Sequence, residues 1–146
     1  MKTVKILTNH KKSVRSICVS EKDKMLVSAG CDNIKLYNLP NGDFRENLIN
    51  SSETIFNTVA ISRNNVIAAG GDNGILSFWD MESGKNFQLE DVKPQKGSLE
   101  SEAGIFSVKF DYSASRLITV GCDKTIKMWK EIDENENIEE ISVNNN

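Results

Sequence analysis

The side chains that could carry acid–base, nucleophilic or metal chemistry are few and far apart in this chain. Its 146 residues include one histidine, His10, and three cysteines, Cys18, Cys31 and Cys122. A structural zinc site needs four such ligands at short spacings, and a hydrolytic triad needs a histidine together with a nucleophile and a carboxylate. The sequence shows neither pattern, so we expect no catalytic residue, no metal, no cofactor and no enzymatic activity.

One glycine-rich segment, GGDNG at residues 70–74, has the composition of a phosphate-binding loop. It lacks the Gly-Lys-Ser/Thr ending whose lysine and hydroxyl contact phosphate and magnesium. Its Asp72 and the later Asp80 also lack the Asp-x-Asp spacing of a calcium loop. Because apolar runs flank the segment on both sides, we interpret it as a hairpin turn.

That turn belongs to a pattern that occurs three times. Each copy has an apolar run, a glycine, an Asp-containing turn, a second apolar run and a final aromatic residue. The copies lie in residues 26–37, 67–79 and 117–129. Their aromatic residues Tyr37, Trp79 and Trp129 are 42 and 50 residues apart. Repeats of about 40 residues built from short strands and Asp turns are typical of β-propeller blades.

The elements around the repeats define the predicted organisation. An alternating apolar segment precedes each copy, and a more polar segment follows two of them. We therefore expect an all-β chain of about three four-stranded antiparallel blades in an incomplete ring, since closed propellers need about four to eight blades. The predicted propeller segment is 1–130, with an orphan outer strand in 1–9, blades in 10–49 and 50–91, an inserted loop in 92–103 and an incomplete blade in 104–130.

The repeats resemble WD repeats, which are named for a pair that occurs here as Trp79-Asp80. The resemblance implies that a histidine, a serine or threonine, the turn aspartate and the strand tryptophan form one hydrogen-bonded set, the tetrad, within a blade. In the first repeat the tetrad would be His10, Ser28, Asp32 and Tyr37, with tyrosine in the place of tryptophan. In the third it would be Thr119, Asp123 and Trp129, with Ser101 at the histidine position.

The second repeat departs furthest from this pattern. Ser52 stands at its histidine position, Ala68 or Ala69 at its hydroxyl position, and its turn has one extra residue. We expect its internal hydrogen bonding to be incomplete and this blade to be the loosest.

Longer segments resemble one subfamily, the pleiotropic regulators, which are WD-repeat components of the spliceosome's nineteen complex. The matching segments lie in residues 31–48, 71–88 and 97–127. The most specific of them is the insertion GSLESEAGIF at 97–106, which a generic WD repeat does not carry. The resemblance, over about residues 2–140, implies the C-terminal part of a larger propeller. It further implies a non-catalytic nuclear scaffold in pre-mRNA splicing, with other spliceosomal proteins as partners.

Two other functions stay open on the sequence alone. One is a substrate-receptor propeller of a cullin-type ubiquitin ligase, and the other is a generic signalling scaffold. The insertion favours splicing, and the identity of co-purifying proteins would separate the three.

Partner binding would use the face on which the innermost strands begin. The equivalent positions there are Arg15, Asn57 and Phe106, and arginine and phenylalanine are residues that bury well in interfaces. For Phe106, packing between blades is an equal alternative. Glu100 and Glu102 in the insertion are candidates for a charged docking loop, and a solvated loop is the alternative.

Charge is unevenly distributed along the chain. The tail, residues 131–146, has six acids and no base and is expected to be disordered, whereas the first fifteen residues have five bases and no acid. Those bases could lie near RNA phosphate or an acidic partner, or form a solvated edge. No aromatic residues alternate with them, so we expect no direct sequence-specific RNA binding.

Three expectations complete the sequence reading. No segment has the length of a transmembrane helix or a signal peptide, so no membrane association is expected. The odd number of cysteines favours a reducing compartment. Open blade edges expose apolar faces and unpaired backbone, which favours self-association.

Overall fold

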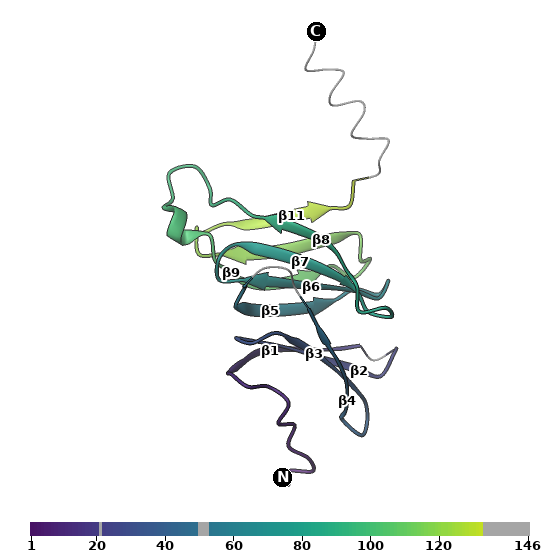
Figure 1. The fold of residues 1–146 in the computed structure, drawn as a ribbon. Helices are drawn as coiled ribbons and strands as arrows, with labels where there is room; N and C mark the ends of the chain where they lie inside the picture. Colours follow the sequence, from purple (N-terminus) through teal and green to yellow (C-terminus); the bar gives the residue numbers. More distant parts are fainter. Residues whose placement is uncertain (21, 50–52, 133–146) are drawn as a thin grey trace.

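The computed structural model describes residues 1–20, 22–49 and 53–132, and in them eleven strands form three antiparallel sheets stacked in chain order (Figure 1). The first sheet contains β1 (Val14–Ser20), β2 (Met25–Gly30), β3 (Ile34–Asn38) and β4 (Asp43–Leu48). The second contains β5 (Phe56–Ile61), β6 (Val66–Gly71), β7 (Ile75–Asp80) and β8 (Asn86–Asp91). The third contains β9 (Ile105–Phe110), β10 (Arg116–Gly121) and β11 (Ile126–Lys130), and the 3₁₀ helix η1 (Glu100–Glu102) precedes it.

The turns between the first two strands of each sheet have one backbone feature in common. A non-glycine residue adopts a positive φ there, namely Lys24 at 51°, Asn65 at 62° and Ala114 at 61°. Such a left-handed residue reverses the chain within a short loop, which lets two short strands pair at once. The same turn is thus used three times, as the sequence repeat requires.

Two apolar cores lie between the three sheets. The first joins sheets one and two and includes Val27, Leu36, Ile67 and Trp79, each fully buried. The second joins sheets two and three and includes Ala60, Ala68, Leu76, Val92, Ile105, Val108 and Leu117. The middle sheet is therefore covered on both faces, and each blade depends on its neighbour for burial.

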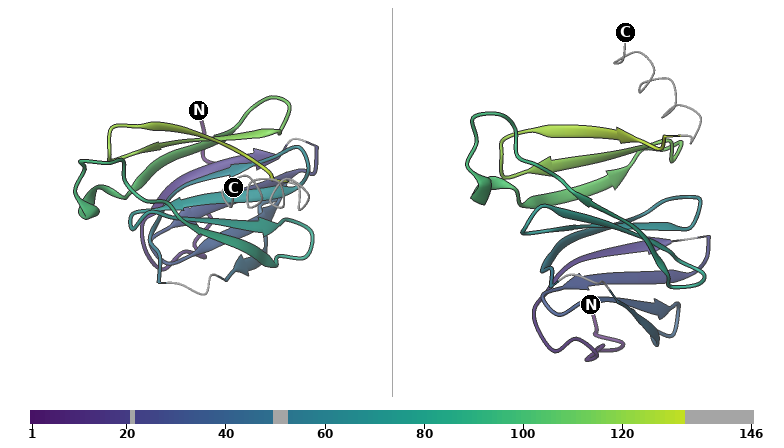
Figure 2. Two further views of the ribbon diagram at one scale, coloured as in Figure 1. Left: turned by 90° about the horizontal axis from the view of Figure 1, so that it is seen from above. Right: turned by 45° about the horizontal axis from the view of Figure 1, so that its top comes forward.

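Of the innermost strands, β5 contacts both β1 and β9, so one side of the stack is a row of first strands. The right view of Figure 2 shows the three sheets as successive layers, and the left view looks down on them from above. This arrangement confirms the predicted all-β architecture of propeller blades, in which the last blade has three strands.

The N-terminal segment differs from the prediction. Residues 2–8 form no strand, so the orphan outer strand predicted in 1–9 is not observed. A strand is defined by its pairing, and none of the three described sheets pairs with this segment. It lies instead beside the β3–β4 turn, where Lys5 donates a hydrogen bond to the Asn41 carbonyl at 2.7 Å. The predicted disordered tail falls largely on residues 133–146, outside the described residues.

Candidate functional site

The first blade contains a hydrogen-bonded chain of four side chains. His10 Nδ1 lies 2.6 Å from an Asp32 carboxylate oxygen, and His10 Nε2 lies 2.6 Å from Ser28 Oγ. The Tyr37 hydroxyl bonds to Ser28 in turn. Because a carboxylate only accepts, His10 Nδ1 carries the proton and donates to Asp32. The structure therefore brings together all four residues that the sequence assigns to this tetrad.

Asp32 is the charged member of that chain. Burial opposes its ionisation, but hydrogen bonds from the Lys11 backbone and from His10 outweigh burial and lower the pKa of Asp32 to about 2. Its second oxygen accepts the Lys11 N–H at 2.9 Å. The carboxylate thereby fixes the segment that enters β1, which is a structural role. Among the described residues, its partners His10, Lys11 and Lys35 all belong to the same blade.

The third blade uses a different partner for its turn aspartate. Trp129 Nε1 donates to Thr119 Oγ1 at 2.9 Å, as the tetrad pattern predicts. Asp123, which is 1% exposed, accepts the Gln95 backbone N–H at 2.8 Å, and Gln95 Nε2 donates to the Asp123 carbonyl at 2.9 Å. The assignment of Ser101 to the histidine position is therefore wrong, because Ser101 lies exposed in η1. The insertion displaces it, and Gln95 takes its place.

A lysine completes the polar environment of Asp123. Lys127 Nζ lies 2.5 Å from the carboxylate, and the Thr125 hydroxyl donates to it at 2.6 Å. These two hydrogen bonds, against the effect of burial, hold the pKa of Asp123 far below its usual range. Lys35 occupies the corresponding place in the first blade, at 3.9 Å from Asp32. Sequence analysis missed this lysine, although an Ile-Lys pair follows both turns and could have indicated it.

The middle blade satisfies its tryptophan without a hydroxyl. Trp79 is fully buried, and its Nε1 donates to the Ile49 carbonyl at 3.2 Å. Ala69 stands opposite Ser77 where the other blades have Ser28 and Thr119, so the tetrad is incomplete, as predicted. Ser52 lies outside the described residues. The expectation that this blade is the loosest stays a prediction, and burial on both faces opposes it.

The three positions predicted for partner binding have a common backbone geometry. Each of Arg15, Asn57 and Phe106 is the extra residue of a β-bulge, where the innermost strand shifts register against its neighbour. A bulge re-aims its side chain and bends the strand, and bulges are frequent beside functional sites. The strand alternation alone cannot reveal this feature, because it requires knowledge of the pairing partner.

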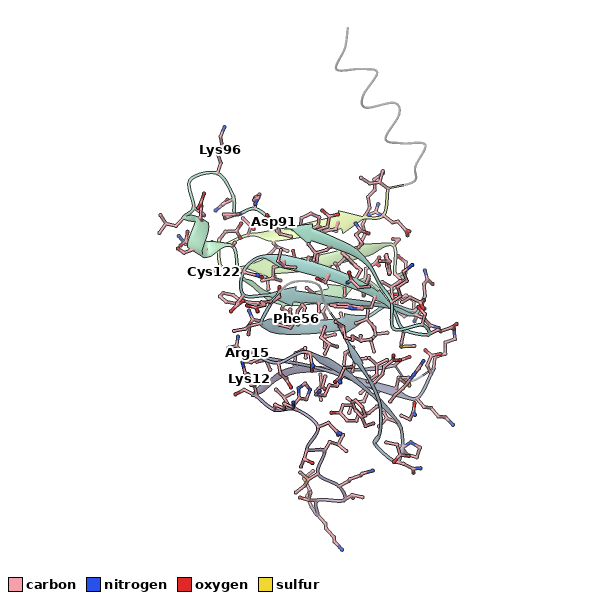
Figure 3. The ribbon with its side chains drawn as sticks, in the orientation of Figure 1. Lys12, Arg15, Phe56, Asp91, Lys96 and Cys122 are labelled. Atoms are coloured by element: carbon pink, nitrogen blue, oxygen red, sulfur yellow. The ribbon has the colours of Figure 1, made fainter. Side chains whose placement is uncertain are left out.

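The bulges are also connected to one another. The Arg15 guanidinium donates to the Asn57 side-chain oxygen, and Asn57 Nδ2 donates to the Ile105 carbonyl at 3.0 Å. Three blades are therefore linked along one rim, which we call the bulge rim and define as Arg15, Asn57 and residues 105–106. Figure 3 shows Lys12, Arg15 and Cys122 along the same side of the stack, with Lys96 at the tip of the insertion.

The side chains of the bulge rim and of the neighbouring insertion differ in how exposed they are. Phe106 is 59% exposed, so the alternative that it packs between blades is not the observed state. Leu99, which sequence analysis did not single out, is 69% exposed at the start of η1. Glu102 accepts the Leu99 N–H at 3.0 Å and lies 3.8 Å from Lys124, whereas Glu100 is exposed. Phe106 and Leu99 are therefore two exposed apolar side chains, and Leu99 adjoins the charged Glu102.

The insertion is fixed to the blades at both ends. The Val92 N–H donates to the Gly74 carbonyl at 3.0 Å, and the Cys122 N–H donates to the Gly104 carbonyl at 2.8 Å. Between these points Gln95 is held by Asp123. Within the described residues there is no group of three His, Cys, Asp or Glu side chains suited to a metal ion, and none of their helices is long and apolar enough to span a membrane.

Comparison with known proteins agrees with this geometry. A family described as "Nucleolar protein 10-like, N-terminal domain", a β-propeller family, matches residues 9–139. Protein pleiotropic regulator PRL2 of Arabidopsis thaliana is 48% identical over 130 residues, which cover 89% of this chain and 27% of the relative. Pre-mRNA-splicing factor PRP46 of Candida glabrata is 40% identical over 130 residues, covering 89% and 30%.

A human relative extends the comparison. Pleiotropic regulator 1 of Homo sapiens is 44% identical over 106 residues, covering 73% of this chain and 20% of the relative. The chain thus spans between a fifth and a third of the length of the relatives it matches.

Proposed function

The chain belongs to the β-propeller family described as nucleolar protein 10-like, N-terminal domain, with pleiotropic regulators among its relatives, and on this premise we propose that it is a non-catalytic scaffold in pre-mRNA splicing. The name of the Candida glabrata relative, a pre-mRNA-splicing factor, supports this process. The proposed location is the nucleus, and the proposed assembly is the spliceosome-associated nineteen complex.

The observation that carries the proposal is the bulge rim. Three equivalent residues from three blades lie on one edge, and hydrogen bonds between blades hold Arg15 and Asn57 in place. A side chain held in its binding conformation loses little entropy when a partner arrives, so a fixed rim favours protein–protein binding. The polar side chains of the first-blade tetrad bond instead to one another, as do those of Thr119 and Trp129, which argues against a catalytic role for them.

The chemistry of the rim suggests the kind of partner surface. Arg15 lies near Lys11 and Lys12 at the entrance to β1, and Phe106 adds an exposed aromatic ring at the entrance to β9. Such a surface suits a spliceosomal protein that presents acidic side chains next to an apolar one. Stacking aromatics do not alternate with these bases, so sequence-specific RNA reading is not part of the proposal.

The test is co-purification with a matched control. The chain carrying Arg15→Glu and Phe106→Ala is compared with the unmodified chain, each tagged and recovered from nuclear extract. Tyr112→Ala is the control, because Tyr112 is 83% exposed beyond the opposite end of β9 and contacts Arg63.

The outcomes separate the candidate functions. We expect spliceosomal proteins to co-purify with the unmodified chain and the control, and to be lost from the double variant. Recovery of a cullin adaptor instead would favour the ubiquitin-ligase function, and equal recovery of splicing proteins by all three chains would place the binding surface elsewhere.

A further inference from the structure

The insertion that connects the second and third sheets is fastened to a turn of each. At its start, the Val92 N–H donates to the Gly74 carbonyl at 3.0 Å. Further on, Gln95 donates to Asp123 through its backbone N–H at 2.8 Å and through its side-chain amide at 2.9 Å. In Figure 1 the insertion and η1 project beyond the ends of the strands. The insertion therefore bridges the seam between two blades, and the sheets on both of its sides belong to the described part of the chain.

The glycine-rich turn of the middle blade, residues 70–74, forms the seat for this insertion. Gly74 has a φ of +84°, and a Cβ at its position would lie 2.9 Å from the Cβ of Ala103. A Cβ on Gly104, where the insertion ends, would lie 3.0 Å from the Asp72 carbonyl oxygen. Side chains at these two positions would push the insertion off the turn, so glycine is needed for the close approach of the two backbones.

Hydrogen bonds within the insertion hold its exposed part in one conformation. The Ser98 N–H donates to the Gln95 carbonyl at 3.0 Å, and the Glu102 N–H donates to the Leu99 carbonyl at 2.9 Å. The Glu102 carboxylate accepts the Leu99 N–H at 3.0 Å and lies 3.8 Å from the Lys124 ammonium on the β10–β11 turn. A backbone held in this way loses little entropy when a partner binds to it.

The carboxylates of the insertion and of the adjoining turn differ in how their charge is balanced. Asp123 has Lys127 beside it, and Glu102 has Lys124. Glu100 is exposed, and among the described residues its carboxylate has no ion-pair partner. Its negative charge is therefore available to a cation of a binding partner.

Leu99 places an apolar side chain directly before this charge in the sequence. It is 69% exposed, and η1 begins at the next residue. Single exposed leucines are common on protein surfaces, so exposure alone does not indicate a contact. Here the leucine adjoins an unpaired carboxylate on a backbone that is fixed to two blades. An apolar contact with a charged border is the usual composition of a protein interface.

We propose that residues 98–101 are a docking element for a partner protein, whose surface offers an apolar pocket to Leu99 and a lysine or arginine to Glu100. RNA is not the proposed partner, because its phosphates would meet the Glu100 carboxylate. The docking element shares no residue with the bulge rim. The inference rests on the proposed scaffold function, to which it adds a second binding surface.

The test is a site-specific photo-cross-link with the full chain in nuclear extract. The photoreactive residue benzoylphenylalanine replaces Ser101, which is exposed in η1, so that Leu99 and Glu100 stay unchanged. The control chain carries it in place of Ser115, which is exposed on the β9–β10 turn. We expect one prominent protein adduct from position 101 and none of the same mass from position 115. The cross-linked peptide, identified by mass spectrometry, should contain apolar residues and a lysine or arginine.

Two variants of the photoreactive chain test the chemistry of the contact. Leu99→Asp and Glu100→Lys should each lower the adduct yield by about tenfold, through a lost apolar anchor and through charge repulsion. The same changes at exposed positions of β8, Phe87→Asp and Glu90→Lys, are the matched controls and should leave the yield unchanged. Thermal melts of the four variants verify that each retains the fold.

The proposal would be overturned by an equal adduct from position 115, by an adduct to RNA, or by an adduct within the chain itself at the mass of one copy. A yield that either Leu99→Asp or Glu100→Lys fails to lower would also overturn it.

The proposed function has a separate readout, which is the identity of the captured protein. A protein from another process, captured in a way that depends on both residues, would support the docking element and contradict the splicing function. Splicing proteins that co-purify without any adduct from position 101 would support the function and refute the docking element.

Discussion

Replacing Asp123 by alanine should destabilise the last blade more than any other single change at a turn. Its carboxylate is almost fully buried and accepts from the Gln95 backbone, the Thr125 hydroxyl and the Lys127 ammonium, at 2.8, 2.6 and 2.5 Å. Alanine leaves all three donors without their acceptor. The variant also removes one of the two hydrogen bonds that hold the insertion at Gln95 and leaves the one from Gln95 Nε2 to the backbone carbonyl of residue 123.

The magnitude follows from these contacts. Hydrogen bonds to a charged group contribute about 1.5–3 kcal/mol each, and removing one member of a buried ion pair costs about 3–5 kcal/mol. The Lys127 side chain is 27% exposed, so water can solvate its ammonium after the change and the loss lies at the low end. We expect the free energy of unfolding to fall by about 3 kcal/mol, which corresponds to a decrease in Tm on the order of 10 °C.

The assay combines denaturant unfolding with hydrogen exchange. Fluorescence of Trp79 and Trp129 follows unfolding, and amide exchange at Gln95 reports the lost acceptor. Asp72→Ala is the matched control, since Asp72 occupies the corresponding turn of the middle blade and is exposed. It should change stability by no more than about 0.5 kcal/mol. Equal unfolding midpoints for the two variants, with Gln95 exchange unchanged, would refute the assigned role of Asp123.

Three further predictions concern the other blades. The stabilisation from Asp32 should be lost as the pH falls from 4 to 2, because its pKa of about 2 lies below the usual 3.8. In the variant Asp32→Asn, the free energy of unfolding should fall by about 2 kcal/mol less over this pH range than in the unmodified chain. Gly74→Ala, at φ +84° with its new Cβ 2.9 Å from the Val92 carbonyl oxygen, should cost more in thermal melts than Gly97→Ala, at φ +93° in open space. Trp79→Phe should lower stability by about 2 kcal/mol in urea titrations, through a lost hydrogen bond to Ile49 and a cavity, and an unchanged midpoint would contradict its burial.

The repeat made most of the fold predictable from the sequence. Alternating apolar residues and Asp turns indicate strands whichever blade they are in, and the tetrad of the first blade follows from residue types at fixed spacing. His10, Ser28, Asp32 and Tyr37 all meet in the structure because no insertion interrupts that repeat. Local sequence and tertiary packing agree there.

The rest depended on information that spacing does not contain. One of the two hydrogen bonds from Gln95 to Asp123 uses the backbone N–H, which any residue other than proline could donate, and the other ends on a backbone carbonyl, so neither has a sequence signature. Trp79 donates to the Ile49 carbonyl, and a backbone acceptor likewise has no sequence signature. The bulge at Arg15 depends on the register of β1 against β2, a property of the pair and not of either strand.

The fixed insertion has a consequence for how this surface can change over time. Both of its ends are tied to neighbouring turns through backbone atoms, at Val92 with Gly74 and at Gly104 with Cys122. Residues 96–101 between these ties are mostly exposed and contribute little to the cores. Substitutions in this stretch alter what the surface presents without altering where it is presented. The blades therefore keep the position of this loop constant while its residues vary. Binding preference can in this way evolve almost independently of folding.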